Sequence, residues 1–276
     1  MNADSAPIIH PTDFSDESMT AFAHALKISL AAKCKLYVVH VAEREDADEW
    51  QAFPHVRRML ASWGLLEANA PTAAIFDRLG VEVAEVEIEP LEPVRGLARF
   101  LEGHPSDLVV LATQGREGLP RWVRPSIAEA MARRAHMQTL FVPPHDAGFV
   151  DEKTGAFDLK RVLFPVDHHP AAGPALGAIQ RFCRALGVQP GIHALHIGAD
   201  APVLSTSADP ADIVAVELRA GNVVDNILQA AADMKANLIG MATAGHHGLL
   251  DALRGSTTER VLRQAPCPVL AIPTGG

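Results

Sequence analysis

Cysteine and net positive charge are scarce in this sequence, and each scarcity excludes a class of protein. The three cysteines, Cys34, Cys183 and Cys267, are too few and too far apart to build a disulfide framework or a cysteine metal site. We therefore expect a reducing compartment, the cytoplasm. The formal net charge of −9 argues against a nucleic acid or an anionic membrane surface as the main partner, because binding phosphates requires clustered lysine and arginine.

Long apolar runs are also missing. No stretch approaches the roughly 20 apolar residues that cross a bilayer, and the opening residues, MNADSAPIIH, lack the basic and apolar regions of a secretory signal. The sequence therefore predicts no membrane association. The 276 residues, of which 48% are hydrophobic, are sufficient for two domains that each bury a core.

What the chain does contain is an internal repeat. Residues 107–143 align without a gap with residues 237–273. Near the start of each half the segment IIHPTDFS matches VLFPVDHH, which pairs Asp13 with Asp167. A polar stretch separates the halves. We therefore predict a first domain at 1–144, a linker at 145–158 and a second domain at 159–276.

Short β-rich runs alternate with helical stretches in both halves, which predicts an α/β fold. Such alternation favours two tandem doubly wound domains, each with a five-stranded parallel sheet in the order 3-2-1-4-5. A second helix is not expected in the second half, since residues 199–212 are short and rich in proline. The expected helices of the first half lie at 16–32, 45–67, 93–103 and 126–136. The expected strands of the first half lie at 7–12, 35–41, 81–88, 108–113 and 139–142. The expected strands of the second half lie at 161–166, 192–197, 213–218, 238–243 and 268–272.

In that strand order the first and fourth strands lie side by side, and ligands bind beyond their carboxyl ends. In the second half Asp167 follows the first strand, and the segment GHHGLLDALRGSTTERVL (245–262) follows the fourth. The glycines of this segment could serve a tight turn in which Ser256 and Glu259 form a capping box. They could also bring backbone N–H groups close to a phosphate, with hydroxyls from Ser256 and Thr257. The position opposite Asp167 favours the phosphate cradle.

The polar residues at this edge allow alternative roles. Asp167 could cap the following helix, or it could accept hydrogen bonds from the amino group of a ligand's base. Five of the thirteen histidines fall at the same edge, namely His168, His169, His196, His246 and His247. Of these, His168, His196 and His246 could ligate zinc or a similar metal. No H-x-x-x-H spacing accompanies them, so ordinary strand and loop positions are the favoured interpretation.

Together these features resemble the universal stress protein family in its tandem, two-domain form. The resemblance is strongest in GSTTERVLRQAPCPVLAIP and covers nearly all of the chain except the linker. It implies an adenine nucleotide alpha hydrolase-like fold that binds ATP or AMP, with or without Mg²⁺. It also implies that Asp167 contacts the adenine and that Ile197 offers its backbone to the base, while the ribose and phosphates are held by Gly245, Gly248, Gly255, Ser256 and Thr257.

The sequence departs from the family in two places. The family spacing is G-x2-G-x9-G-[S/T], whereas six residues separate Gly248 from Gly255, a shortening that would weaken triphosphate binding. In the first half Pro125 stands where Gly255 stands, and Ile127 replaces Thr257. Because proline has no N–H to donate, we expect the first half to be a scaffold and the second to bind the ligand.

The sequence thus predicts a nucleotide-binding stress or regulatory protein. No Walker lysine and no positioned nucleophile accompany the glycines, so slow ATP hydrolysis is the most catalysis that we expect. Two alternatives remain open: a zinc site or slow metal-dependent hydrolase built from the histidines, and a ligand-free interaction module. The two last strands, TLFVP and PVLAI, are apolar edges that invite pairing. We expect them to join the halves as an intramolecular pseudo-dimer, and a homodimer of whole chains stays open.

Overall fold

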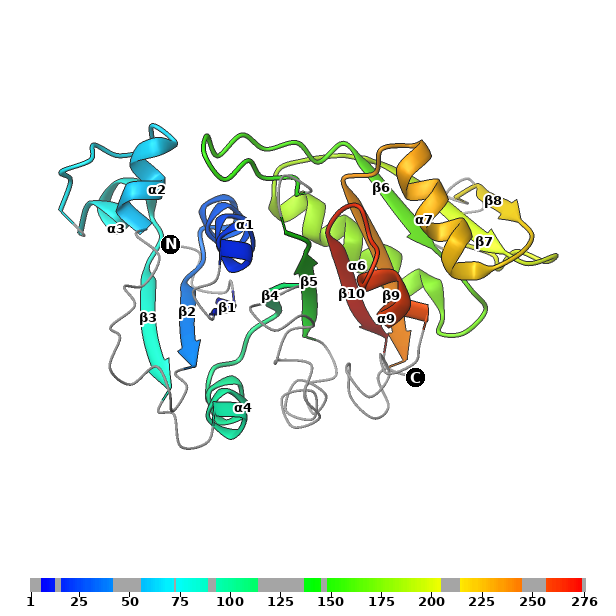
Figure 1. Cartoon of the computed structure of the whole chain (residues 1–276), viewed down its shortest axis with the longest axis horizontal. Helices are drawn as coiled ribbons and strands as arrows, with labels where there is room; N and C mark the ends of the chain where they lie inside the picture. The colour runs from blue at the N-terminus through cyan, green and yellow to red at the C-terminus, as the bar shows by residue number, and fades with distance from the viewer. Residues whose placement is uncertain are drawn as a thin grey trace.

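Ten strands pair into one continuous sheet in the computed structural model of this protein (Figure 1). The order is β3-β2-β1-β4-β5-β10-β9-β6-β7-β8. We call β1–β5 with their helices the first half, and β6–β10 with theirs the second half. The residues that the structure describes are 6–12, 16–41, 56–71, 73–88, 93–113, 137–144, 148–204, 214–244 and 257–274.

Each half is a parallel sheet in the order 3-2-1-4-5, which confirms the predicted topology. The central strands are apolar and buried on both faces, as parallel strands covered by helices must be. The first half contains β1 (Ile8–Thr12), β2 (Leu36–Val41), β3 (Val83–Ile88), β4 (Leu108–Ala112) and β5 (Gln138–Val142); the second contains β6 (Arg161–Pro165), β7 (Gly191–Ile197), β8 (Val216–Arg219), β9 (Leu238–Ala244) and β10 (Val269–Thr274).

The two halves join through their last strands. β5 pairs antiparallel with β10, with Leu140 opposite Leu270 and Thr139 opposite Ala271, and all four residues are fully buried. The predicted pairing of the two apolar edges is therefore confirmed. Because each half is parallel within itself and the junction is antiparallel, the carboxyl ends of the two halves lie at opposite edges of the sheet.

Helices cover both faces of the sheet, and each face has a core that runs through both halves. The helices α1 and α6 pack on one face, and α4, α7 and α9 pack on the other. α6 approaches β9 closely, because a Cβ on Gly240 would lie 2.4 Å from Ile179 Cδ1. The helix bounds are α1 (Asp16–Ala32), α2 (Val56–Ser62), α3 (Ala73–Leu79), α4 (Pro93–Gly103), α6 (Ala172–Ala185), α7 (Val223–Asp233) and α9 (Thr257–Leu262).

One expected helix ends earlier in the sequence than predicted. The apolar spacing predicted a helix over 45–67, but α2 ends at Ser62, and Gly64 then turns the chain with a φ of 70°. The helix α3, which follows, was not expected. Residues 42–55 and the helix expected at 126–136 lie outside the described residues. None of the described helices is long and apolar enough to cross a membrane.

The segment that joins the halves is held by His24 of α1. The ring is fully buried; its Nδ1 donates to the Thr20 carbonyl at 2.7 Å, and its Nε2 accepts from the backbone N–H groups of Phe149 at 3.0 Å and Val150 at 3.2 Å. Gly148 passes so close that a Cβ there would lie 2.1 Å from His24 Cε1. A neutral imidazole with one donor and one acceptor satisfies all three bonds, so His24 must be neutral in the folded protein.

The His24 contact predicts a pH-dependent stability. Burial lowers the pKa of His24 from 6.5 to about 4. As pH falls from 6.5 toward 4 the unfolded chain binds a proton that the folded chain does not, so this part of the stability is complete above 6.5 and is lost in that window. A lowering of the His24 pKa from 6.5 to about 4 corresponds to about 3 kcal/mol of folding free energy.

We expect His24→Gln to remove that part of the pH dependence, as measured by urea unfolding between pH 4 and 7. The matched control is His104→Gln, since His104 also bonds the carbonyl four residues before it, that of Phe100 at 2.9 Å, but holds no linker N–H in the described part of the chain. Equal pH slopes for the wild type and His24→Gln would contradict the assignment.

The β5–β10 pairing predicts that residues 158–276 alone will dimerise. Without β5, the apolar edge of β10 is exposed, and a second copy can cover it by the same antiparallel pairing. Sedimentation equilibrium of this fragment should show a dimer. A folded fragment that stays monomeric at high concentration would count against this prediction.

Candidate functional site

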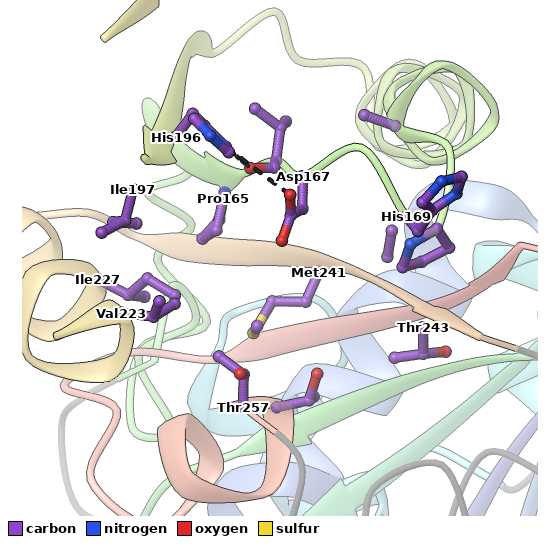
Figure 2. A pocket seen from close by; sticks show the side chains of 15 residues that line it. Pro165, Asp167, His169, His196, Ile197, Val223, Ile227, Met241, Thr243 and Thr257 are labelled. Carbon is purple, nitrogen blue, oxygen red and sulfur yellow. Dashed lines mark hydrogen bonds and ion pairs between the residues drawn. The ribbon is translucent and has the colours of Figure 1, made fainter. Parts of the chain in front are cut away.

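A pocket of about 270 Å³ lies at the carboxyl ends of β6 and β9 (Figure 2). These strands are neighbours, with Val162 opposite Leu238 and Leu163 opposite Ile239, and they are the first and fourth strands of the second half. The lining residues come from the end of β6, the loop into α6, β7, α7, β9 and α9. The pocket is therefore at the switch point of the strand order, where doubly wound sheets bind ligands.

Three of the predicted site residues line this pocket together: Asp167, Ile197 and Thr257. Asp167 follows β6, Ile197 ends β7 and Thr257 begins α9, so they come from three different elements. Asp167 and Thr257 are 90 positions apart in the sequence, so the fold alone brings them together. The other four predicted residues, Gly245, Gly248, Gly255 and Ser256, lie outside the described residues.

Asp167 presents a carboxylate to the pocket. Its Oδ1 accepts a hydrogen bond from the His168 N–H at 2.7 Å, and its side chain is 70% exposed. Nδ1 of His196 lies 4.0 Å from the same oxygen. Within the described residues Oδ2 makes no hydrogen bond. The hydrogen bond from the His168 N–H to Oδ1 is typical of a turn after a strand, and Oδ2 can accept a hydrogen bond from a ligand.

His196 forms the wall behind Asp167. The ring is buried, and its Nδ1 donates to the Val166 carbonyl at 2.9 Å. This bond fixes the ring and selects the tautomer with its proton on Nδ1. Gly198 leaves room for the opposite side of the ring, since a Cβ there would lie 2.4 Å from His196 Nε2. His196 is thus a structural support of the pocket in this arrangement.

The end of the pocket that β7 and α7 form is apolar. Figure 2 shows Ile197, Val223 and Ile227 gathered there, with Met241 next to them. The start of α7 is fixed by its cap, because Asn222 Oδ1 accepts from the backbone N–H of Val224 at 3.0 Å. An aromatic ring could lie against these aliphatic and thioether side chains with one edge toward Asp167, which is the usual mixture in a small-molecule site.

The sequence interpretation missed the residues that β9 contributes. Met241, Ala242 and Thr243 line the pocket, but their apolar strand pattern is typical of residues that pack in a core. A signal was available, since Ala112-Thr113 in the first half repeats Ala242-Thr243 ahead of the glycines. In a buried strand, however, threonine is also an ordinary β-former, so the repeat alone did not separate a ligand contact from packing.

The corresponding place in the first half is built differently. Thr12 at the end of β1 occupies the position of Val166, and its Oγ1 lies 2.9 Å from Ser18 Oγ, with both residues buried. Two buried hydroxyls that hydrogen-bond each other pack the first turn of α1 against the strand end. The residues that would decide ligand binding there, Asp13, Pro125 and Ile127, lie outside the described residues.

The described part of the chain contains two of the three histidines of the metal alternative, His168 and His196. No group of three or more histidine, cysteine or acidic side chains there could hold a metal ion. The rings of His168 and His196 are 5.6 Å apart, but His168 Nε2 donates to the Asp200 carbonyl at 2.9 Å. Burial raises the pKa of Cys183 to about 11 and of Cys267 to about 12, so these thiols stay protonated and are poor ligands and nucleophiles. His246 lies outside the described residues.

Comparison with known proteins gives consistent matches. The profile of the universal stress protein family matches residues 6–143 and 203–273. Universal stress protein MJ0531 of Methanocaldococcus jannaschii is 28% identical over 144 residues, which cover 49% of this chain and 80% of that protein.

Two solved structures share the fold over almost the entire chain. One is a universal stress protein from Archaeoglobus fulgidus, with a TM-score of 0.59, 18% identity and 98% of each chain covered. The other is PA1789 from Pseudomonas aeruginosa, described as functionally unknown, with a TM-score of 0.57 and 13% identity over 98% of this chain and 92% of that one.

We expect no zinc site that depends on the second-half histidines. Titration calorimetry of chelator-treated protein with Zn²⁺ should give the same isotherm for the wild type and for the double variant His168→Ala, His246→Ala, because the His168 ring is already bonded to a backbone carbonyl. Stoichiometric binding that is lost in the double variant would support the metal alternative instead.

Proposed function

The chain belongs to the universal stress protein family, and from that premise we propose that the pocket between β6 and β9 binds an adenine nucleotide, ATP or AMP. The observation that carries the proposal is the convergence of Asp167, Ile197 and Thr257 on one pocket from three separate elements. In this proposal the protein is a regulatory stress-response protein that responds to bound nucleotide, and slow hydrolysis is the most catalysis it performs.

The adenine is proposed to lie between the apolar end of the pocket and Asp167. The Asp167 carboxylate can accept from the exocyclic amino group, which adenine has and guanine lacks at the same position. The backbone of Ile197 offers further hydrogen bonds to the edge of the base, and Met241 and Ile227 provide the surface for its face. A volume of about 270 Å³ suits the base and sugar, with the phosphates extending toward residues 245–256.

The phosphate loop is proposed to have its full length. In the family spacing G-x2-G-x9-G-[S/T], Ala242 can take the place of the first glycine, and Ala242 lines the pocket. Gly245 is then the second glycine, nine residues separate it from Gly255, and Ser256 follows. In this register the glycine at 248 is an additional loop residue, and the shortening inferred from Gly248 does not arise. The loop can then accept a triphosphate as well as AMP, with Mg²⁺ bound to the phosphates.

The halves are proposed to be unequal, with a scaffold at 1–144, a linker at 145–158 and the nucleotide-binding domain at 159–276. Gly255 has an N–H where the first half has Pro125, and Thr257 has a hydroxyl where the first half has Ile127. A hydrogen bond to a charged phosphate oxygen contributes about 1.5–3 kcal/mol, so the first half lacks a large part of the binding energy.

Equilibrium dialysis with labelled ATP tests both the site and the inequality. We expect one equivalent per wild-type chain, and at least tenfold weaker binding for Gly255→Pro, which copies the first half's chemistry into the second. Pro125→Gly is the matched control and should gain little, since Ile127 still has no hydroxyl. Circular dichroism of each variant checks that the fold is retained.

Three results would contradict the proposal. Undiminished ATP binding by Gly255→Pro would place the site elsewhere. Two equivalents of ATP bound per wild-type chain would show that both halves bind nucleotide. No binding of either ATP or AMP to the wild type would favour the ligand-free interaction module.

A further inference from the structure

Two hydrogen bonds from β7 hold the backbone immediately before Asp167. Val166 directly follows β6, and its N–H donates to the Leu195 carbonyl at 2.9 Å. Its own carbonyl accepts from Nδ1 of His196 at 2.9 Å. Val166 and His196 are both buried, so both bonds are protected from water. The peptide group that joins Val166 to Asp167 is thus fixed to the neighbouring strand by a buried side chain.

The His196 ring is itself held by its neighbours. The His168 ring meets it edge-on, with the ring centroids 5.6 Å apart and an interplanar angle of 78°. The His168 ring is in turn fixed, because its Nε2 donates to the Asp200 carbonyl at 2.9 Å. On the other side the ring lies directly against the backbone of Gly198, where a Cβ would be 2.4 Å from Nε2. These contacts restrict the ring to the orientation in which Nδ1 faces the Val166 carbonyl.

The Asp167 side chain, by contrast, is 70% exposed and is held by one short hydrogen bond, from the His168 N–H to Oδ1 at 2.7 Å. Figure 2 shows the His196 ring behind the carboxylate. Nδ1 of His196 is 4.0 Å from Oδ1, which is too long for a hydrogen bond. The ring therefore acts on Asp167 through the backbone, and the direction of the carboxylate depends on the peptide group that His196 fixes.

We infer that His196 is a positioning residue that holds Asp167 toward the base and so makes the site selective for purines with an exocyclic amino group. This inference rests on the proposed nucleotide function and adds the residue on which the selectivity depends. An ionised carboxylate only accepts hydrogen bonds, so it rewards the amino group of adenine and gives nothing to a purine without it. A site of this kind discriminates between such ligands only when its contacting group is held in place by supporting residues.

The test compares ATP with purine riboside triphosphate, which differs from ATP only by the missing amino group. Titration calorimetry gives the ratio of the two affinities, which a uniform loss of binding does not change. We expect the wild type to bind ATP about tenfold more tightly. The ratio should fall toward one in His196→Leu, which has no donor. It should be largely kept in His196→Asn, which has nearly the same shape as leucine and an amide N–H that can reach the Val166 carbonyl.

His10→Leu is the control for the loss of a buried ring. His10 lies on β1 of the first half, is fully buried, and its Nδ1 bonds to the Val110 carbonyl at 3.0 Å, but it does not line the pocket. Both leucine variants should lower the melting temperature, because each leaves a carbonyl without its partner. His10→Leu should nevertheless keep the wild-type affinity ratio. Circular dichroism checks each fold, and His196→Ala replaces His196→Leu if the latter does not fold.

A double-mutant cycle with Asp167→Ala tests whether His196 acts through Asp167. If it does, adding His196→Leu to Asp167→Ala should cause little further loss of ATP affinity, because the group that His196 positions is already absent. Additive losses in the cycle overturn the inference, and so does a wild-type affinity ratio in His196→Leu. Equal affinities of the wild type for the two triphosphates also overturn it, while the nucleotide function stands. Absence of ATP and AMP binding by the wild type overturns the proposed function together with this inference.

Discussion

The antiparallel pairing of β5 with β10 is the constraint on which the rest of the structure depends. Each half alone would end in an apolar strand with unpaired backbone groups, and an open edge of that kind recruits another strand. Pairing Leu140 with Leu270 covers both edges at once and places both residues fully out of solvent. It also lets the apolar core on each face continue from one half into the other, so that the two repeats stabilise each other.

The connecting segment adds a second, polar constraint. Backbone N–H groups of Phe149 and Val150 bond to the buried His24 ring, and the Trp63 indole donates to the Glu152 carbonyl at 2.9 Å. Gly155 lies against Trp63, where a Cβ would be 2.5 Å from the ring. A polar, glycine-containing stretch that appears in the sequence as a simple linker is thus bound to the first half by specific hydrogen bonds. A tethered linker fixes where β6 begins and therefore where the second half starts on the sheet.

The candidate site is a consequence of strand order. Parallel strands must be apolar where they are covered on both faces, so polar side chains gather where the strands end. In the second half that rule places Asp167 after β6 and Ile197 at the end of β7, around the pocket that β9 and α9 complete. The same rule in the first half gives the buried pair Thr12 and Ser18. At this matching strand end the two halves therefore differ in chemistry, with Thr12 in the first half where the second half has Val166.

The sequence by itself determined the repeat, the ten strands, their order in each half and the pairing of the last strands, because these follow from apolar periodicity and from the gap-free match of 107–143 with 237–273. It also singled out Asp167 after a strand and Thr257 at the start of a helix, while Ile197 came from the family resemblance, and all three line the pocket. Tertiary structure decided what periodicity does not encode. Gly64 ends α2 early and a further helix follows, His24 bonds to the backbone of the linker, and Met241, Ala242 and Thr243 of β9 line the pocket. A histidine in a helix has the same local pattern whether its ring faces solvent or the backbone of a distant segment, as the His24 ring does. The three-dimensional packing decides between these cases, because the burial and the partners of a polar side chain depend on atoms that are distant in the sequence.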